Sequence, residues 1–138
     1  MRTRVSRFAH VLERIGLALA GAACGLFVAA HVGSSIALLT SLGFIFVMMI
    51  AGAVGFYLGI DTPPLPFHPP DGSWSKVDAA ELLSALGTFL ATMTAFVSVS
   101  VIMFRQEPAL LWTAMIMLGW TVGVAMQIVA GAIARRRR

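Results

Sequence analysis

The side chains that could bind a soft metal ion are spread thinly along the chain. Cys24 and His31 lie seven residues apart, so they share one face of a helix, and eight methionines add thioether groups. Thiol and thioether ligands suit Cu(I). No two methionines lie three or four residues apart, however, and the three histidines fall near the terminus, at a turn and in a loop. Because methionine is also a common apolar filler, we predict neither a metal site nor a cofactor.

The middle of the chain holds the residues that could form a catalytic group. Asp61, His68 and Asp71 could supply an acid and a base, and Ser73 or Ser75 a nucleophile. They lie in a segment that contains five of the six prolines, and nothing in such a stiff, extended segment fixes their mutual geometry. We therefore do not expect an enzyme.

Four apolar segments make up about two thirds of the chain, and none contains Asp, Glu, Lys or Arg. They are residues 15–32, 36–60, 82–104 and 109–134. A helix of roughly 20 residues crosses the ~30 Å hydrocarbon layer of a bilayer. Only 12% of all residues are charged, against about 25% in soluble domains. The sequence predicts an all-α integral membrane protein, a single domain with four transmembrane helices.

Proteins that move protons or ions normally keep an ionisable residue inside the membrane. His31 lies at the end of the first apolar segment, beside the expected turn, so we expect no ionisable residue inside the membrane. This pattern argues against proton or ion transport.

The four helices are expected to form two hairpins. One continuous helix over residues 15–60 would span about 69 Å, more than twice the bilayer, so the chain must turn back. The best turn signal is Gly33–Ser35, and either serine could cap the second helix. Asp78 and Glu81 resemble a capping box for the third helix, and residues 105–108 join it tightly to the fourth.

Basic residues gather at both ends of the chain. Four of the ten lie in a basic N-terminal segment, residues 1–14, and four form the tail Arg135–Arg138. Basic residues collect on the cytoplasmic side of membrane proteins, so both termini are predicted to be cytoplasmic, in the bacterial inner membrane. The tail is expected to contact anionic lipid headgroups, which explains the net charge of +4 without nucleic-acid binding. One alternative stays open: residues 1–30 resemble a secretory signal, and cleavage after Ala30 would leave three helices.

The proline-rich loop, residues 61–77, joins the two hairpins and is predicted to be cytoplasmic as well. Its prolines favour an extended backbone that presents side chains to a partner. Phe67, His68 and Trp74 are the candidate contact residues.

Small residues recur at a spacing of four along three of the helices. The candidate packing residues are Gly21, Gly25, Gly55, Gly59, Gly119, Gly123, Gln127 and Gly131. Such rows let helix backbones approach closely. They either hold the bundle together or bind a second membrane protein or a second copy of the chain.

Polar side chains inside the predicted spans also allow two interpretations. Ser84, Thr88 and Thr92 form a stripe on the third helix, and Gln127 is the only amide within the spans. Hydroxyl groups in helices often bond to the carbonyl four residues earlier, and an amide in hydrocarbon should bond to a neighbouring helix. These residues therefore pack helices together, or they line a polar path.

The sequence favours a non-enzymatic accessory, assembly or regulatory subunit of a larger membrane complex, with other membrane subunits or further copies of itself as partners. The alternative is a small oligomeric transporter or channel for a neutral or lipophilic solute, including a hole-forming lysis protein.

Overall fold

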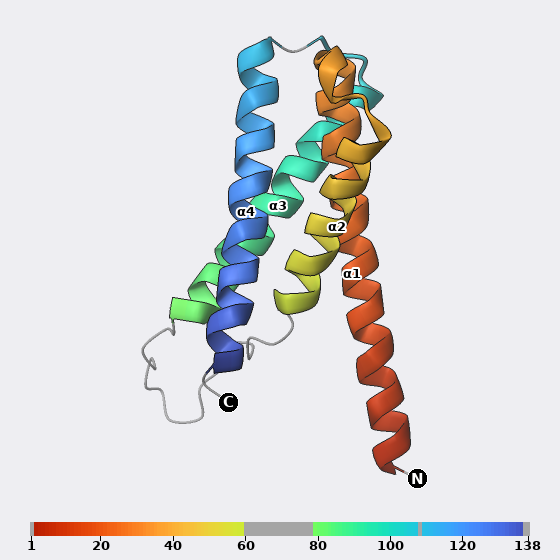
Figure 1. Cartoon of the computed structure of the whole chain (residues 1–138), viewed down its shortest axis with the longest axis vertical. Coiled ribbons are helices and arrows are strands. Elements are labelled where there is room, and N and C mark those ends of the chain that lie inside the picture. The colour runs from red at the N-terminus through yellow and green to blue at the C-terminus, as the bar shows by residue number, and fades with distance from the viewer. Residues whose placement is uncertain (1, 60–78, 108, 137–138) are drawn as a thin grey trace.

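The computed structural model describes residues 2–59, 79–107 and 109–136, which form a bundle of long helices (Figure 1). The elements in chain order are α1 (Arg2–Ser35), the short 3₁₀ helix η1 (Ala37–Leu39), α2 (Leu42–Gly59), α3 (Ala79–Met103) and α4 (Leu110–Arg136). Each of the four α-helices is long and apolar enough to cross a membrane, which confirms the prediction of an all-α membrane protein at that level. The candidate loop contacts Phe67, His68 and Trp74, the capping residue Asp78 and the last two arginines of the tail lie outside the described residues.

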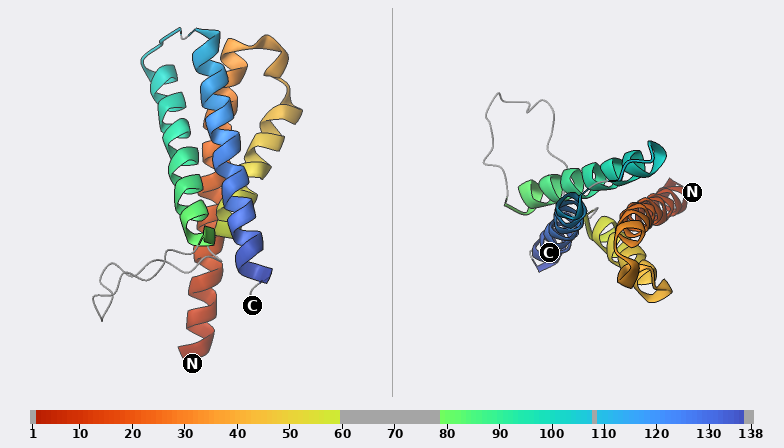
Figure 2. Two further views of the ribbon diagram at one scale, coloured as in Figure 1. Left: turned by 90° about the vertical axis from the view of Figure 1, so that its left-hand side faces the viewer. Right: turned by 90° about the horizontal axis from the view of Figure 1, so that it is seen from above.

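The helices pair as two hairpins. α1 packs along α2, and α3 packs along α4, while α2 hardly touches α3. α4 also packs against α1 and α2, and α3 packs against α1, so both helices of the second hairpin contact the first hairpin. The free ends of α1 and α4 lie at one end of the bundle, and the two tight turns lie at the other (Figures 1 and 2). We call the end formed by residues 36–41 and 104–107 the turn end.

The first hairpin turns later in the chain than the sequence indicates. Ser34 and Ser35 belong to α1, because their hydroxyls donate to the carbonyl oxygen of His31 at 2.7 and 3.2 Å instead of capping the next helix. The reversal occupies residues 36–41, and Ser41 caps α2 by accepting a hydrogen bond from the amide of Phe44 at 3.3 Å. α2 therefore has 18 residues, and His31 lies within a helix.

Glycine allows the backbones of the first hairpin to touch. A Cβ built on Gly21 would lie 2.7 Å from the carbonyl carbon of Gly52, and one built on Gly25 would lie 2.7 Å from that of Met48. Real Cβ atoms essentially never approach another atom within 3.0 Å. The spacing of α1 and α2 thus requires hydrogen as the side chain at these positions.

The second hairpin uses the same device. A Cβ on Gly123 of α4 would lie 2.8 Å from the amide nitrogen of Ala91 and 2.8 Å from the carbonyl oxygen of Gly87. Between the hairpins, Val28, Trp120 and Val124 belong to one buried apolar cluster. Close backbone contact within each hairpin and side-chain packing between hairpins together form the core.

Candidate functional site

The glycines predicted to pack helices all face another helix of the bundle. They are Gly21, Gly25, Gly55, Gly59, Gly119, Gly123 and Gly131. Three of them lie between the hairpins: a Cβ on Gly131 would lie 2.8 Å from the carbonyl oxygen of Leu58, one on Gly55 3.1 Å from a methyl group of Val124, and one on Gly59 3.7 Å from the hydroxyl oxygen of Ser84. This arrangement matches the intramolecular alternative, and it places these small-residue faces inside the bundle.

Gln127 forms the hydrogen bond between helices that its position in the sequence predicts. Its side chain is 1% exposed, and its Nε2 donates to the hydroxyl oxygen of Thr88 at 2.9 Å, which joins α4 to α3. The Thr88 hydroxyl in turn donates to the carbonyl oxygen of Ser84 at 2.8 Å. The amide oxygen of Gln127 points towards Gly55 and has no hydrogen-bond partner among the described residues.

The hydroxyl stripe of α3 does not stay on one face. Ser84 is buried, Thr88 is half-buried and Thr92 is exposed. The hydroxyls of Thr88 and Thr92 each donate to the carbonyl four residues earlier, both at 2.8 Å. The stripe therefore begins inside the bundle and runs outward along α3, with the hydroxyl hydrogens of Thr88 and Thr92 bonded to their own helix.

A polar cavity opens at the turn end. It has a volume of about 520 Å³ and lies between the last turn of α1 and the turn that joins α3 to α4. Its lining includes His31, Ser34 and Ser35 on one side, and Arg105 and Glu107 on the other. We call it the turn-end cavity. Small-molecule sites commonly measure ≈ 300–1,000 Å³, so this cavity is large enough to hold a ligand.

His31 forms the buried wall of the turn-end cavity. The side chain is 1% exposed, and its Nε2 lies 3.4 Å from the hydroxyl oxygen of Thr113 on α4. Its Nδ1 has no hydrogen-bond partner among the described residues. An ionisable residue therefore lies within the first candidate span, His10–Ser35, which corrects the expectation that the spans contain none.

Arg105 reaches the turn-end cavity from a strained backbone position. The amide of Arg105 bonds to the carbonyl of Ile102 at 3.2 Å, and that of Gln106 bonds to the carbonyl of Val101 at 3.0 Å. This is the Schellman motif, whose left-handed position usually holds glycine. Here Arg105 occupies it with a φ of 51°, a conformation that costs an ordinary residue about 1–2 kcal/mol.

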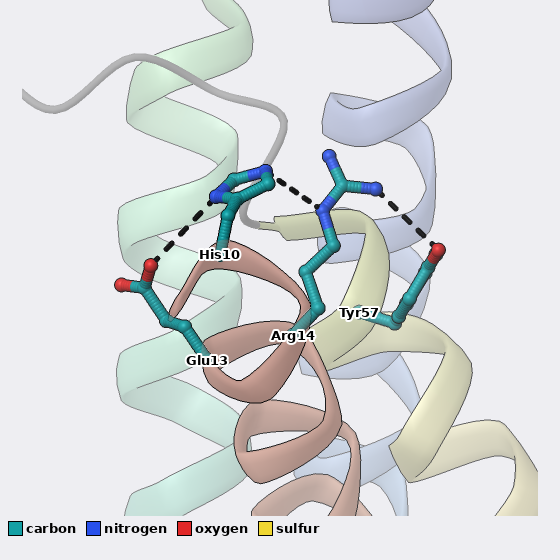
Figure 3. Close-up of polar contacts among 4 residues, drawn as sticks. All are labelled: His10, Glu13, Arg14 and Tyr57. Atoms are coloured by element: carbon teal, nitrogen blue, oxygen red, sulfur yellow. Dashed lines mark hydrogen bonds and ion pairs between the residues drawn. The ribbon is translucent and has the colours of Figure 1, made fainter. Parts of the chain in front are cut away.

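A second polar cluster lies at the opposite end, where the basic segment of α1 meets α2 (Figure 3). The guanidinium of Arg14 lies 5.2 Å from the ring centroid of Tyr57, and its Nη1 donates to the Tyr57 hydroxyl at 3.4 Å. Its Nε donates to Nε2 of His10 at 3.1 Å, and Nδ1 of His10 lies 3.8 Å from Glu13. Arg14 thus links the N-terminal part of α1 to the C-terminal end of α2.

The sequence pointed to the residues that pack helices, but it did not point to the turn-end cavity. Two signals were available: a histidine within an apolar run, where polar side chains are costly, and two opposite charges in a four-residue turn. These residues come together only because the two hairpins pack side by side, and the spacing of residues in the sequence does not show that packing.

Metal-binding side chains do not gather in the described parts of the chain. Among residues 2–59, 79–107 and 109–136, no three His, Cys, Asp or Glu side chains lie close enough to hold an ion. Cys24 is half-buried in α1, away from the turn-end cavity. The chain matches no protein-family model, no curated protein and no solved structure.

Proposed function

We propose that this protein is a non-enzymatic accessory, assembly or regulatory subunit of a larger complex in the bacterial cytoplasmic membrane. The supporting observation is a row of large apolar side chains on the outer face of α3. The row consists of Leu82, Leu86, Phe89, Met93, Phe96 and Met103, all exposed. We call it the α3 outer row.

The spacing of the α3 outer row is that of a helix-pairing seam. From Leu82 to Phe96 its members are separated by alternating steps of four and three residues, the a and d positions of a heptad, and Met103 follows seven residues later. Because lipid supplies no hydrophobic force between helices, association depends on how side chains interlock. The glycine rows are occupied within the bundle, so a partner helix would pack on these larger side chains.

The first experiment is gentle purification from native membranes, followed by mass spectrometry of what copurifies. The proposal expects one stoichiometric membrane partner. Replacing Phe89 and Phe96 with alanine should remove that partner, whereas replacing Leu111 and Leu118 on the outer face of α4 should not. A homo-oligomer without any partner, or equal retention by both variants, would contradict the proposal.

The proposed orientation has both termini in the cytoplasm. The free ends of α1 and α4 lie at the same end of the bundle, and eight of the ten basic residues belong to the terminal segments (Figure 1). Reporter fusions at Pro69 and Arg138 should both report the cytoplasm. An external Arg138 would overturn this orientation and the four-span topology together.

A small oligomeric transporter or channel is the second candidate. Three buried polar atoms lack hydrogen-bond partners among the described residues: Nδ1 of His31, Nε1 of Trp120 and Oε1 of Gln127. Such atoms commonly bond to internal water, which a polar path would contain. If a path exists, Gln127→Leu should reduce solute flux into liposomes while the exposed Thr92→Val leaves it unchanged. For the lysis variant, controlled expression should arrest growth and cause leakage.

A further inference from the structure

The turn-end cavity combines charged groups of both signs. Arg105 and Glu107 both line it, and neither forms an ion pair with another described residue. A guanidinium binds phosphate or carboxylate oxygens through paired hydrogen bonds. A carboxylate accepts hydrogen bonds from an ammonium group. The cavity therefore fits a ligand that carries an anion and an N–H cation a short distance apart.

The α1 side of the cavity adds hydrogen-bond acceptors that suit an ammonium group. Nδ1 of His31 has no partner in the described structure, and leaving a buried polar atom unpaired is unfavourable. The hydroxyls of Ser34 and Ser35 use their hydrogens on the carbonyl of His31, so their oxygens remain able to accept. When Thr113 donates to Nε2 of His31, Nδ1 carries the hydrogen and remains a buried donor beside the cavity.

A second, less polar cavity adjoins the first. It has a volume of about 320 Å³ and shares Val101, Gln106 and Glu107 with the turn-end cavity. Its other lining residues include Trp112 and Ile116, which extend it along α4. A charged cavity at the membrane surface that continues into an apolar one suits an amphiphile better than a fully water-soluble molecule.

We propose that the turn-end cavity binds the phosphate–ammonium headgroup of a zwitterionic phospholipid such as phosphatidylethanolamine. Arg105 binds the phosphate, Glu107 accepts hydrogen bonds from the ammonium group, and the adjoining cavity takes the start of an acyl chain. Glycine would adopt the left-handed backbone of Arg105 at lower cost, so an arginine at this position is consistent with a role for its side chain. This site is separate from the α3 outer row, so it does not depend on the proposed function.

The test is native mass spectrometry of the full chain with an equimolar mixture of phosphatidylethanolamine, phosphatidylcholine and phosphatidylglycerol that carry the same acyl chains. Phosphatidylcholine lacks N–H donors and phosphatidylglycerol lacks the cation. We expect phosphatidylethanolamine to be retained about tenfold better than either, the factor that corresponds to ~1.4 kcal/mol. Equal retention of the three lipids would overturn the proposal.

Matched variants test which group of the lipid Arg105 and Glu107 each bind. Glu107→Gln should abolish the preference for phosphatidylethanolamine over phosphatidylglycerol, and Arg105→Gln should weaken retention of both. Glu81→Gln and Arg136→Gln, which lie at the opposite end of the bundle, should change neither. An unchanged preference in Glu107→Gln, with thermal unfolding like that of the wild type, would refute the assignment.

A competition experiment shows whether the ligand is a membrane lipid or a soluble zwitterion. If free phosphoethanolamine displaces the lipid only at far higher concentration than a lysolipid does, the ligand is a membrane lipid, as proposed. If phosphoethanolamine competes equally well, the same two charges bind a soluble zwitterion, and the assignment to a lipid is refuted.

Discussion

Substitution of Gly52 by alanine tests whether the first hairpin depends on backbone contact. A Cβ at this position would lie 2.8 Å from the carbonyl carbon of Gly21 and 3.3 Å from Cζ2 of Trp120. Carbonyl groups on a helix cannot move aside as a flexible side chain can, so α1 and α2 must separate. Overpacking of this kind costs about 1–3 kcal/mol.

Gly16→Ala is the matched control, because a Cβ on Gly16 meets no atom within 4 Å. Both substitutions replace glycine by alanine inside a helix, which favours the helix by about 1 kcal/mol in each case. The difference in unfolding free energy between the two variants therefore isolates the steric cost, and we expect about 1–3 kcal/mol.

Reversible unfolding in mixed dodecyl maltoside and dodecyl sulfate micelles, followed by tryptophan fluorescence, would measure this difference. Trp120 is buried beside the contact and should report its loss. Gly21→Ala should resemble Gly52→Ala, and the double variant should cost less than the sum, because both act on one contact. A Gly52→Ala variant as stable as Gly16→Ala would refute close backbone packing in this hairpin.

Three further substitutions probe the polar contacts and the strained turn. Thr88→Val removes the acceptor of Gln127 and should destabilise the bundle by about 0.6–1.7 kcal/mol, whereas Thr92→Val loses only bonds within its own helix and should cost little. A double-mutant cycle of Thr88→Val with Gln127→Leu measures the coupling energy, and a coupling energy of zero would contradict the hydrogen bond. Arg105→Gly relieves a left-handed φ, so it should raise the unfolding free energy by about 1 kcal/mol while it weakens lipid retention. A lower unfolding free energy would show that the contacts of the arginine side chain stabilise the fold by more than the backbone strain costs. Tyr57→Leu should lower the unfolding free energy by about 0.5–1 kcal/mol by removing the cation–π contact with Arg14, and Tyr57→Phe should lower it less because the ring remains. Equal decreases for the two variants in the same unfolding assay would assign the effect to the hydroxyl instead.

Much of the architecture follows from local patterns. Charge-free apolar runs predict the four helices, and the need to cross a thin layer repeatedly predicts the hairpins. The bond of Gln127 also follows, since an amide in hydrocarbon must find a partner. These features depend on residue type and spacing alone.

The turn of the first hairpin and the turn-end cavity depend on more than local patterns. A serine hydroxyl can either cap the next helix or bond back to its own, and Ser34 and Ser35 do the second. The choice moves the turn beyond residue 35 and places His31 inside α1. Arg105 then approaches His31 only because the two hairpins pack side by side at the turn end.

The buried polar residues of α4 have a consequence for how this chain can change in length. Thr113, Trp120 and Gln127 are seven residues apart and all face the interior. A helix of 3.6 residues per turn rotates by about 100° for each inserted residue. One codon inserted after Ile116 would therefore turn Gln127 away from Thr88, whereas seven inserted codons would restore its direction within ~20° but move it about 10.5 Å along the helix. Insertions within this helix should therefore disrupt the contacts of Gln127 whatever their length.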